Sequence, residues 1–216
     1  CVAGVVKGVS DSAPSLSKLD LLAKGTGAVI YDEGGNELQT LSTSSEQKEY
    51  VKLDKIPACV QYAFVAAVDS RFYEHKGVDL SAIFQEFVDD LSEKDQVKST
   101  STITQQLLRN QVIWKGNGSS VYEKITRKIQ EQYLAVQLEQ KLDKEQILEY
   151  YLNTINLGQN AIGVQNASMR YFNKDISQLS ISEAAVLAGT QQNPTDDNPI
   201  TNPENNSEQR KKVLKA

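Results

Sequence analysis

The stretch 58–68 constrains the fold more than any other part of the sequence, because its residues are apolar nearly all round. Pro57 precedes it and suits the first turn of a helix, where a backbone nitrogen without a hydrogen loses no bond. A helix with apolar side chains on every face has to be surrounded by protein. We therefore expect this helix at the centre of a mainly helical domain.

The rest of the chain divides around this helix, and 216 residues suit one domain with an appended arm. Residues 1–26 are rich in Ser, Gly, Lys and Asp and predict an exposed connector. Residues 27–53 predict a small β arm, with a hairpin around the turn 32–36 and a short strand at 50–53. Residues 57–192 are the expected helical core. Residues 193–216 hold three of the five prolines and predict a linker.

Further helices are expected over 98–111, 122–140, 143–153 and 182–189. Asp143 is the expected N-cap of the third. The helix over 122–140 has an apolar stripe and, on the opposite side, a second apolar face that also carries Arg127 and Glu131. An acidic side chain is thereby placed on a helix predicted to be covered on both faces. The stripe consists of Ile125, Ile129, Tyr133 and Val136, and the second face carries Leu134 and Leu138.

Charge and composition exclude several classes of protein. The 23 basic and 28 acidic residues give a formal charge of −5, which argues against general nucleic-acid binding. Two cysteines, Cys1 and Cys59, and one histidine, His75, cannot assemble a His/Cys metal site or a disulfide framework. The longest apolar runs are far shorter than the ~20 residues that span a bilayer.

Three clusters carry the candidate chemistry, and the first follows the central helix directly. Residues 69–79 pack acidic, basic and imidazole groups into the end of that helix, with Asp69 and His75 among them. A carboxylate at the edge of an apolar helix can have a raised pKa and serve in acid–base chemistry. A solvated helix end has the same composition, and a lone histidine is more often structural than catalytic.

The second cluster combines hydroxyls, carboxamides and a guanidinium at a helix start: Ser101, Thr102, Gln105, Gln106 and Arg109. Backbone N–H groups at a helix N-terminus favour an anion such as phosphate, and these side chains would add to them. Simple capping by Ser and Thr is the alternative.

The third cluster is the pair Arg127 and Glu131, four residues apart on one helix face, with Lys128 beside them. As an exposed ion pair it would contribute little. On a helix covered on both faces, Glu131 becomes a candidate acid or orienting carboxylate, and the two cations become candidates to hold phosphate.

Taken in order, these segments resemble the glycosyltransferase family 51 domain of class A penicillin-binding proteins and monofunctional transglycosylases. The family's first motif, Glu-Asp-x-x-Phe-x-x-His-x-Gly, is similar to the stretch from Asp69 to Gly77. Its Gly-Gly-Ser-Thr-Ile-Thr-Gln-Gln motif is matched by residues 101–106. Its Arg-Lys-x-x-Glu motif is matched by Arg127, Lys128 and Glu131, and its Ile-Leu-Glu-x-Tyr-Leu-Asn helix by residues 147–153. Several motifs in register are far more specific than any one alone.

The resemblance implies a lysozyme-like, two-lobed helical fold with a small membrane-proximal jaw. It implies a transferase that polymerises lipid II into glycan strands on the outer face of the bacterial cytoplasmic membrane, with undecaprenyl pyrophosphate leaving. Expected partners are lipid II, the growing chain and other cell-wall synthesis proteins, with an anchor upstream, a transpeptidase domain downstream and no nucleic acid. The expected cofactor is a divalent cation, Mg or Mn, on the pyrophosphate. Moenomycin is the expected inhibitor.

The resemblance also assigns roles. Glu131 and Asp69 are the candidate catalytic groups that remain, and the binding set is His75, Ser101, Thr102, Gln105, Gln106, Arg109, Arg127 and Lys128. The family's catalytic glutamate falls at Val68, and loss of a positioned general base costs a factor of roughly 10² to 10⁴.

Further departures are Ser99 and Thr100 for the two glycines, Arg109 for a lysine, and Glu123 where some members carry an arginine. One hypothesis is a glycosyltransferase domain weakened or inactivated by Val68, and the other is a non-catalytic relative that binds lipid II or scaffolds cell-wall synthesis. A lysozyme-type hydrolase is disfavoured because hydrolysis needs no pyrophosphate-holding cluster.

Overall fold

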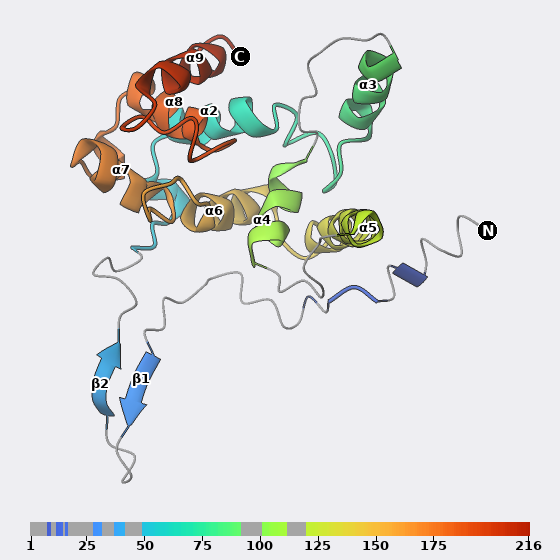
Figure 1. The fold of residues 1–216 in the computed structure, drawn as a ribbon, viewed down its shortest axis with the longest axis horizontal. Coiled ribbons are helices and arrows are strands. Elements are labelled where there is room, and N and C mark those ends of the chain that lie inside the picture. The colour runs from blue at the N-terminus through green and yellow to red at the C-terminus, as the bar shows by residue number, and fades with distance from the viewer. Residues whose placement is uncertain are drawn as a thin grey trace.

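The computed structural model describes residues 49–91, 101–111 and 120–216, together with 8–9, 12–14, 16, 28–31 and 37–41. This part of the chain is mainly helical, as predicted (Figure 1). Its helical elements are η2 Leu53–Lys55, α2 Ala58–Val68, α3 Leu80–Leu91, α4 Ile103–Gln111, α5 Val121–Leu138, α6 Lys144–Thr154, α7 Val164–Phe172, η3 Ile176–Gln178, α8 Ile181–Thr190 and α9 Pro203–Val213.

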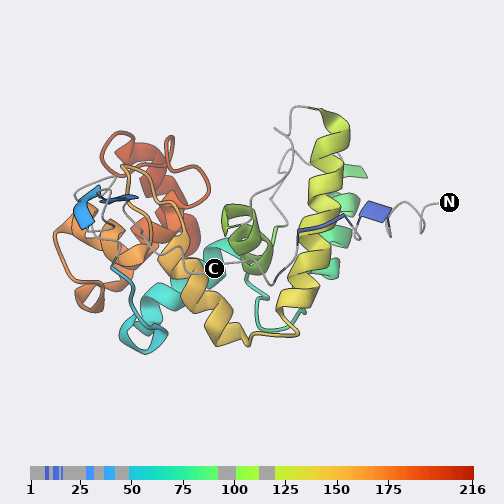
Figure 2. The ribbon, with the colours of Figure 1, turned by 90° about the horizontal axis from the view of Figure 1, so that it is seen from below.

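The helices form two groups with α4 between them (Figure 2). The larger group is built on α2, whose Val60 and Phe64 are fully buried, and α8 packs against both α2 and α9. Phe64 meets Tyr151 of α6 edge-on, with the ring centroids 6.4 Å apart. On the other side α4 packs against both α5 and α6, so α4 joins the long helix α5 to the larger group. This is the expected two-lobed arrangement.

The N-terminal arm contains one antiparallel pair of strands, β1 Ala28–Tyr31 and β2 Glu37–Leu41. The turn predicted at 32–36 lies outside the described residues. The strand expected at 50–53 is wrong, because η2 begins at Leu53 and the preceding backbone bonds to α6 instead of to a sheet. The Val51 N–H donates to Asn153 Oδ1 at 2.8 Å, and the Leu53 N–H donates to Glu149 Oε2 at 2.7 Å.

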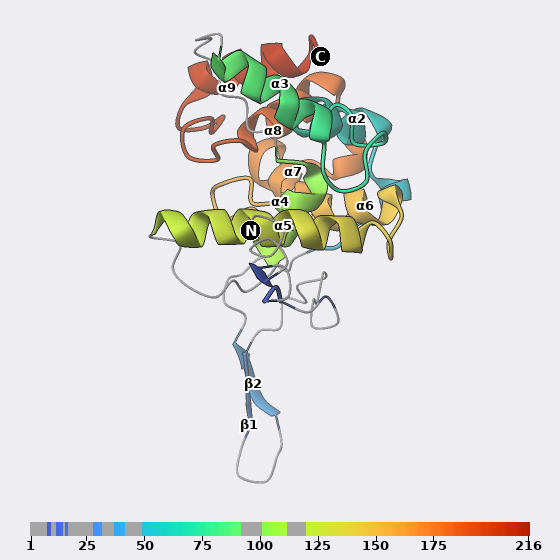
Figure 3. The ribbon, with the colours of Figure 1, turned by 90° about the vertical axis from the view of Figure 1, so that its right-hand side faces the viewer.

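Helix α5, the long helix in Figure 3, differs from its sequence prediction on one face. Glu131, Leu134 and Leu138 are buried, as the second apolar face required. The opposite stripe is not covered by the described residues, since Ile125 is 55% exposed and Tyr133 is 38% exposed. Periodicity identified an apolar stripe correctly, but it could not tell which of two apolar faces would find a partner.

The C-terminal segment also differs from its prediction. Residues 193–216 were expected to be a linker, but α9 forms within them and packs on α8. Pro203 stands at the first turn of α9, where its missing N–H costs nothing. Asn206, 3% exposed, donates from its amide to the Val186 and Asp197 carbonyls and to Thr190 Oγ1. The helix is therefore fixed by buried polar contacts.

Candidate active site

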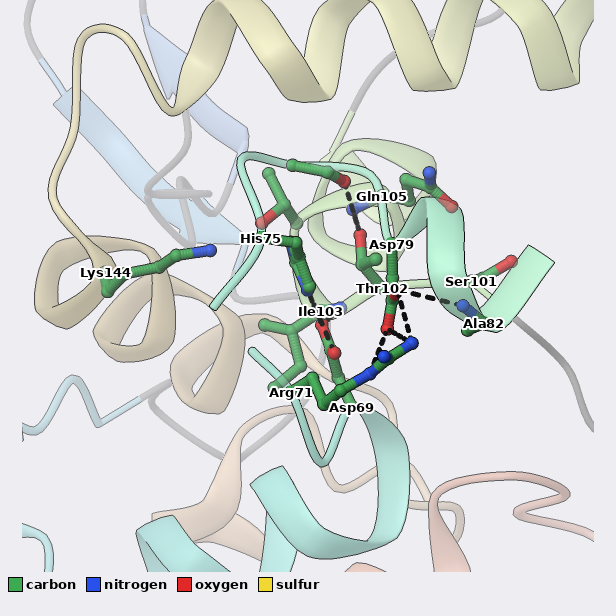
Figure 4. A network of polar contacts seen from close by, with 12 residues as sticks. Asp69, Arg71, His75, Asp79, Ala82, Ser101, Thr102, Ile103, Gln105 and Lys144 are labelled. Carbon is green, nitrogen blue, oxygen red and sulfur yellow. Dashed lines mark hydrogen bonds and ion pairs between the residues drawn. The ribbon is translucent and has the colours of Figure 1, made fainter. Parts of the chain in front are cut away.

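Asp69 joins three elements around the first cluster (Figure 4). It ends α2, and its carboxylate oxygens lie 3.0 and 2.9 Å from Nε2 of His75. The same carboxylate accepts the N–H of Ile103, the first residue of α4, at 3.1 Å. The Asp69 and His75 side chains are only 3% and 7% exposed. Asp69 therefore fixes the start of α4 against the end of α2 and the loop after it.

The loop that follows Asp69 reaches α5 through Gly77. Gly77 has φ of 89°, and a Cβ there would lie 2.6 Å from the backbone carbon and oxygen of Ala135. The hydroxyl of Thr102 donates to the Gly77 carbonyl at 2.7 Å and accepts the N–H of Gln105 at 3.2 Å. Thr102 thus caps α4 and holds the loop at the same time, which is a structural role for a predicted binding residue.

A second link, within the loop after α2, was not predicted from sequence. Arg71 and Asp79 form a two-point ion pair with a shortest N–O distance of 2.6 Å. Asp79 also accepts the Ala82 N–H at the start of α3. Burial acts to raise the pKa of Asp79, but the Ala82 N–H and the Arg71 guanidinium outweigh burial and lower it. The spacing of eight residues in an irregular loop gave no signal for this pair.

Glu131 is the centre of a cationic cluster on α4 and α5. Its side chain is 2% exposed, and Arg109 approaches it with Nη2 at 3.0 Å and Nε at 3.3 Å. Arg127 lies one turn away on α5 with Nε at 3.6 Å. The guanidinium groups are more open than the carboxylate, at 38% and 41% side-chain exposure. A buried carboxylate thus orients two arginines whose outer sides face solvent.

Ser101 brings a third cation into this cluster. Its hydroxyl oxygen accepts from Arg109 Nη2 at 2.9 Å and from Lys128 Nζ at 2.7 Å. A hydroxyl has one proton and two lone pairs, so the Ser101 proton is left to donate elsewhere. Among the described residues, Arg109, Arg127 and Lys128 gather around the single carboxylate of Glu131, and this local excess of positive charge favours an anion. The second and third sequence clusters therefore form one site.

The remaining predicted residues lie around this site in different ways. Gln105 is 1% exposed, and neither atom of its amide has a partner within the described residues. Gln106 is bonded on both amide atoms, to Ser101, Tyr151 and Gln191. Val68 is the last residue of α2 and packs, partly buried, against the apolar core. An apolar side chain therefore stands immediately before Asp69.

Within the described residues, no group of three or more His, Cys, Asp or Glu side chains could hold a metal ion. Glu131, the carboxylate nearest the cationic cluster, is already engaged by two arginines. The protein side chains of this part of the chain do not make a cation site by themselves. In the same residues, no helix is long and apolar enough to cross a membrane.

The fold and the site together define a two-lobed helical domain with a cationic cluster on α4 and α5. Comparison with known families identifies it further. A family profile described as Transglycosylase matches residues 34–216, and the chain therefore belongs to the transglycosylase family. The resemblance drawn from the three motifs is confirmed.

Similar proteins carry the name penicillin-binding protein. Penicillin-binding protein 1A of Clostridium perfringens strain 13 is 41% identical over 188 residues, which cover 85% of this chain and 27% of that protein. Penicillin-binding protein 1A of Clostridium novyi is 38% identical over 196 residues, covering 89% and 22%. Penicillin-binding protein 1A/1B of Bacillus subtilis is 38% identical over 221 residues, covering 99% and 23%. The chain thus spans about a quarter of the length of these relatives.

Proposed function

We propose that this chain is the peptidoglycan glycosyltransferase domain of a longer penicillin-binding protein. It binds lipid II and the growing glycan chain, joins them through the acceptor 4-hydroxyl, and releases undecaprenyl pyrophosphate. The observation that carries the proposal is the cluster of Ser101, Arg109, Arg127 and Lys128 around buried Glu131. A pyrophosphate leaving group needs this charge, whereas hydrolysis of a glycosidic bond does not.

Each residue of the cluster has a part in the transfer. Arg127 and Lys128 neutralise charge that develops on the departing pyrophosphate, and Ser101 donates its remaining proton to a phosphate oxygen. Glu131 keeps Arg109 and Arg127 oriented and is itself too enclosed to meet substrate. A divalent cation, Mg or Mn, would supply further charge neutralisation at the pyrophosphate when bound.

The general base that this reaction needs is missing, because Val68 stands at the position of the family's catalytic glutamate. A valine cannot accept the proton of the acceptor hydroxyl, so we expect polymerisation about 10² to 10⁴ times slower than with a carboxylate at this position. Asp69 is the nearest carboxylate in sequence, but its oxygens already bond to His75 and to the Ile103 N–H. Its side chain is only 3% exposed, so to act as the base Asp69 would have to move towards the substrate and lengthen its bond to the N–H at the start of α4.

Val68 also favours a second, non-catalytic function. Because Val68 packs against the core and leaves the anion cluster intact, the domain would also serve as a non-catalytic binder of lipid II or as a scaffold in cell-wall synthesis. Under both functions the domain works at the outer face of the bacterial cytoplasmic membrane, held by an anchor outside this sequence and beside other cell-wall synthesis proteins. Moenomycin would inhibit the domain under both by competing for the cluster.

The test compares lipid II polymerisation by the protein and by its Val68→Glu and Val68→Gln variants, with detergent and divalent cation present. The glutamine variant is the matched control, since it has the size and polarity of glutamate without a basic oxygen. We expect long glycan chains from Val68→Glu alone, at a rate at least 100-fold above the other two. If lipid II binds but no variant polymerises it, the non-catalytic function stands. If the protein does not bind lipid II, both functions fail.

A further inference from the structure

Gln106 lies in the segment 101–106, to which the family resemblance assigns substrate binding, yet both polar atoms of its amide bond to groups inside the protein. Its Nε2 donates to the Ser101 carbonyl at 3.3 Å. Its Oε1 accepts from the Tyr151 hydroxyl at 3.2 Å and from Gln191 Nε2 at 2.6 Å. Both lone-pair positions of its Oε1 are occupied, and the position of its Nε2 is fixed by the bond to the Ser101 carbonyl.

The Ser101 carbonyl fixes the donor-to-acceptor direction of this chain of hydrogen bonds. The Ser101 carbonyl can only accept, so it requires the nitrogen of Gln106 on its side. The oxygen of Gln106 then faces Tyr151 and Gln191 and needs donors from both. Tyr151 meets this requirement, because burial and the charge of Asp69 raise the pKa of its hydroxyl well above the usual value and keep the proton in place. Gln191 meets it with its amide nitrogen.

Ser101 is consequently held from two sides. On the side-chain side, Arg109 and Lys128 bond to its hydroxyl oxygen, and on the backbone side Gln106 bonds to its carbonyl. Removal of the backbone contact would leave Ser101 free to rotate at the point where α4 begins. The hydroxyl proton that the cluster offers to an anion would then lose its direction.

We infer that Gln191 and Tyr151 are positioning residues for the anion site, acting through Gln106 on the backbone of Ser101. The inference rests on the proposed function, since it assumes that the cluster binds the pyrophosphate of lipid II. Gln191 lies just after α8 in the larger group of helices, so it links that group to the anion cluster. Gln191 acts here as a hydrogen-bond donor: its Nε2 donates to Gln106, whereas its Oε1 is buried and has no partner within the described residues.

The test uses two substitutions of Gln191: one removes its hydrogen-bond donor, and the other replaces the donor with an acceptor. Gln191→Leu removes the donor, and we expect about 3- to 10-fold weaker binding of lipid II in detergent micelles, as for the loss of one hydrogen bond. Gln191→Glu presents an acceptor instead, which forces the Gln106 amide to turn and sets its oxygen against the Ser101 carbonyl. We expect at least 10-fold weaker binding for this variant. Tyr151→Phe removes the other donor and should resemble the leucine variant.

The matched control is Gln192→Leu, since Gln192 is the next residue and its one side-chain bond within the described residues is to the Ala67 carbonyl, at 3.4 Å. Its affinity should stay within twofold of the parent protein. The inference is overturned if both Gln191 variants bind lipid II as the parent does, or if leucine and glutamate are equally harmful. It is also overturned if their loss of affinity follows a fall in the thermal unfolding midpoint, because Gln191 would then be merely structural.

A second measurement separates this inference from the proposed function. Hydrogen–deuterium exchange of residues 101–106 in the ligand-free protein should be faster in Gln191→Glu than in the parent or the Gln192 control. If the parent does not bind lipid II, the proposed function fails, and the exchange alone decides whether Gln191 positions Ser101. Unchanged exchange would then overturn the positioning role.

Discussion

The carboxylate of Glu131 and the guanidinium of Arg109 meet at two points, Oε2 to Nη2 at 3.0 Å and Oε1 to Nε at 3.3 Å. The two residues are 22 positions apart, on α5 and α4, so their contact sets how these helices face each other. The carboxylate is buried while the guanidinium reaches solvent. One residue thus supplies the internal anchor and the other presents positive charge outward, as an anion site requires.

Glu131→Gln is expected to lower the free energy of unfolding by about 1–3 kcal/mol, because two guanidinium groups lose their buried counter-charge. Urea denaturation of the parent and the variant measures this difference. Glu74→Gln is the control, since Glu74 is exposed, and its midpoint should not move. Equal midpoints for all three proteins would show that the Glu131 contacts contribute nothing net to stability.

Gly77→Ala is expected to destabilise the fold by about 2–4 kcal/mol. The new Cβ would lie 2.6 Å from the Ala135 backbone, which cannot yield as a flexible side chain would, and φ of 89° adds strain for any residue with a Cβ. Gly8→Ala is the matched control, because a Cβ there meets nothing within 4 Å. Both variants are compared by urea denaturation, and a Gly77→Ala midpoint equal to that of the control would contradict the close approach of this loop to α5.

The sequence predicted α2, α4, α5, α6 and α8, the elements with a continuous apolar run, an apolar stripe at helical spacing or a clear cap. It did not predict α3, α7 or α9. Helix α7 follows Gly163, which offers no side-chain cap, and α9 is so polar that Asn206 is its only buried residue. Helices α7 and α9 depend on contacts with distant parts of the chain, and local propensity does not carry that information. Helix α3 is different, because Leu80, Ile83, Phe84 and Phe87 recur at helical spacing, a signal that the sequence prediction did not use.

The sequence predicted which residues form the candidate site, but not all of the contacts between them. Spacing on one helix correctly paired Arg127 with Glu131, and the motifs brought in Ser101 and Lys128. Spacing could not show that Arg109 would share Glu131, because the two helices are separated by residues of irregular sequence. The sequence predicts Asp69 as a candidate catalytic group, but it does not predict the bonds of Asp69 to His75 and Ile103, because these depend on the position of α4 beside the end of α2. Its catalytic role stays a prediction.

Lys144→Met is expected to lower the free energy of unfolding by about 2–4 kcal/mol, because it leaves Glu139 buried without a cation. Glu139 is 4% exposed at its side chain, and Lys144 Nζ lies 2.7 Å from it and 4.4 Å above the ring of Phe72. Lys211→Met is the control, since its pair with Glu208 is exposed and worth little. Adding Glu139→Gln to Lys144→Met should recover part of the loss; a double variant no more stable than the single one would contradict an uncompensated charge as the cause.

Acid unfolding should show the contribution of Glu183. The Lys174 ammonium and the Ser180 N–H and hydroxyl lower the pKa of this carboxyl from 4.5 to about 2. Because the folded-state pKa is below the unfolded one, the stabilisation is present above about pH 4.5 and is lost as the pH falls towards 2. Glu183→Gln should therefore be less stable than the parent at pH 7, by about 1 kcal/mol for a weakened helix cap.

The difference between Glu183→Gln and its parent should shrink steadily between pH 4.5 and 2, as measured by urea unfolding at a series of pH values. Glu123→Gln tests the same kind of cap on α5, where Ser120 and Glu123 form an equivalent box that has no lysine partner among the contacts of the described residues. A parallel loss in both variants at all pH values would mean that the cap hydrogen bonds act alone. A loss confined to Glu183→Gln and abolished at low pH would assign the effect to the ion pair with Lys174, which ties the loop after α7 to the first turn of α8.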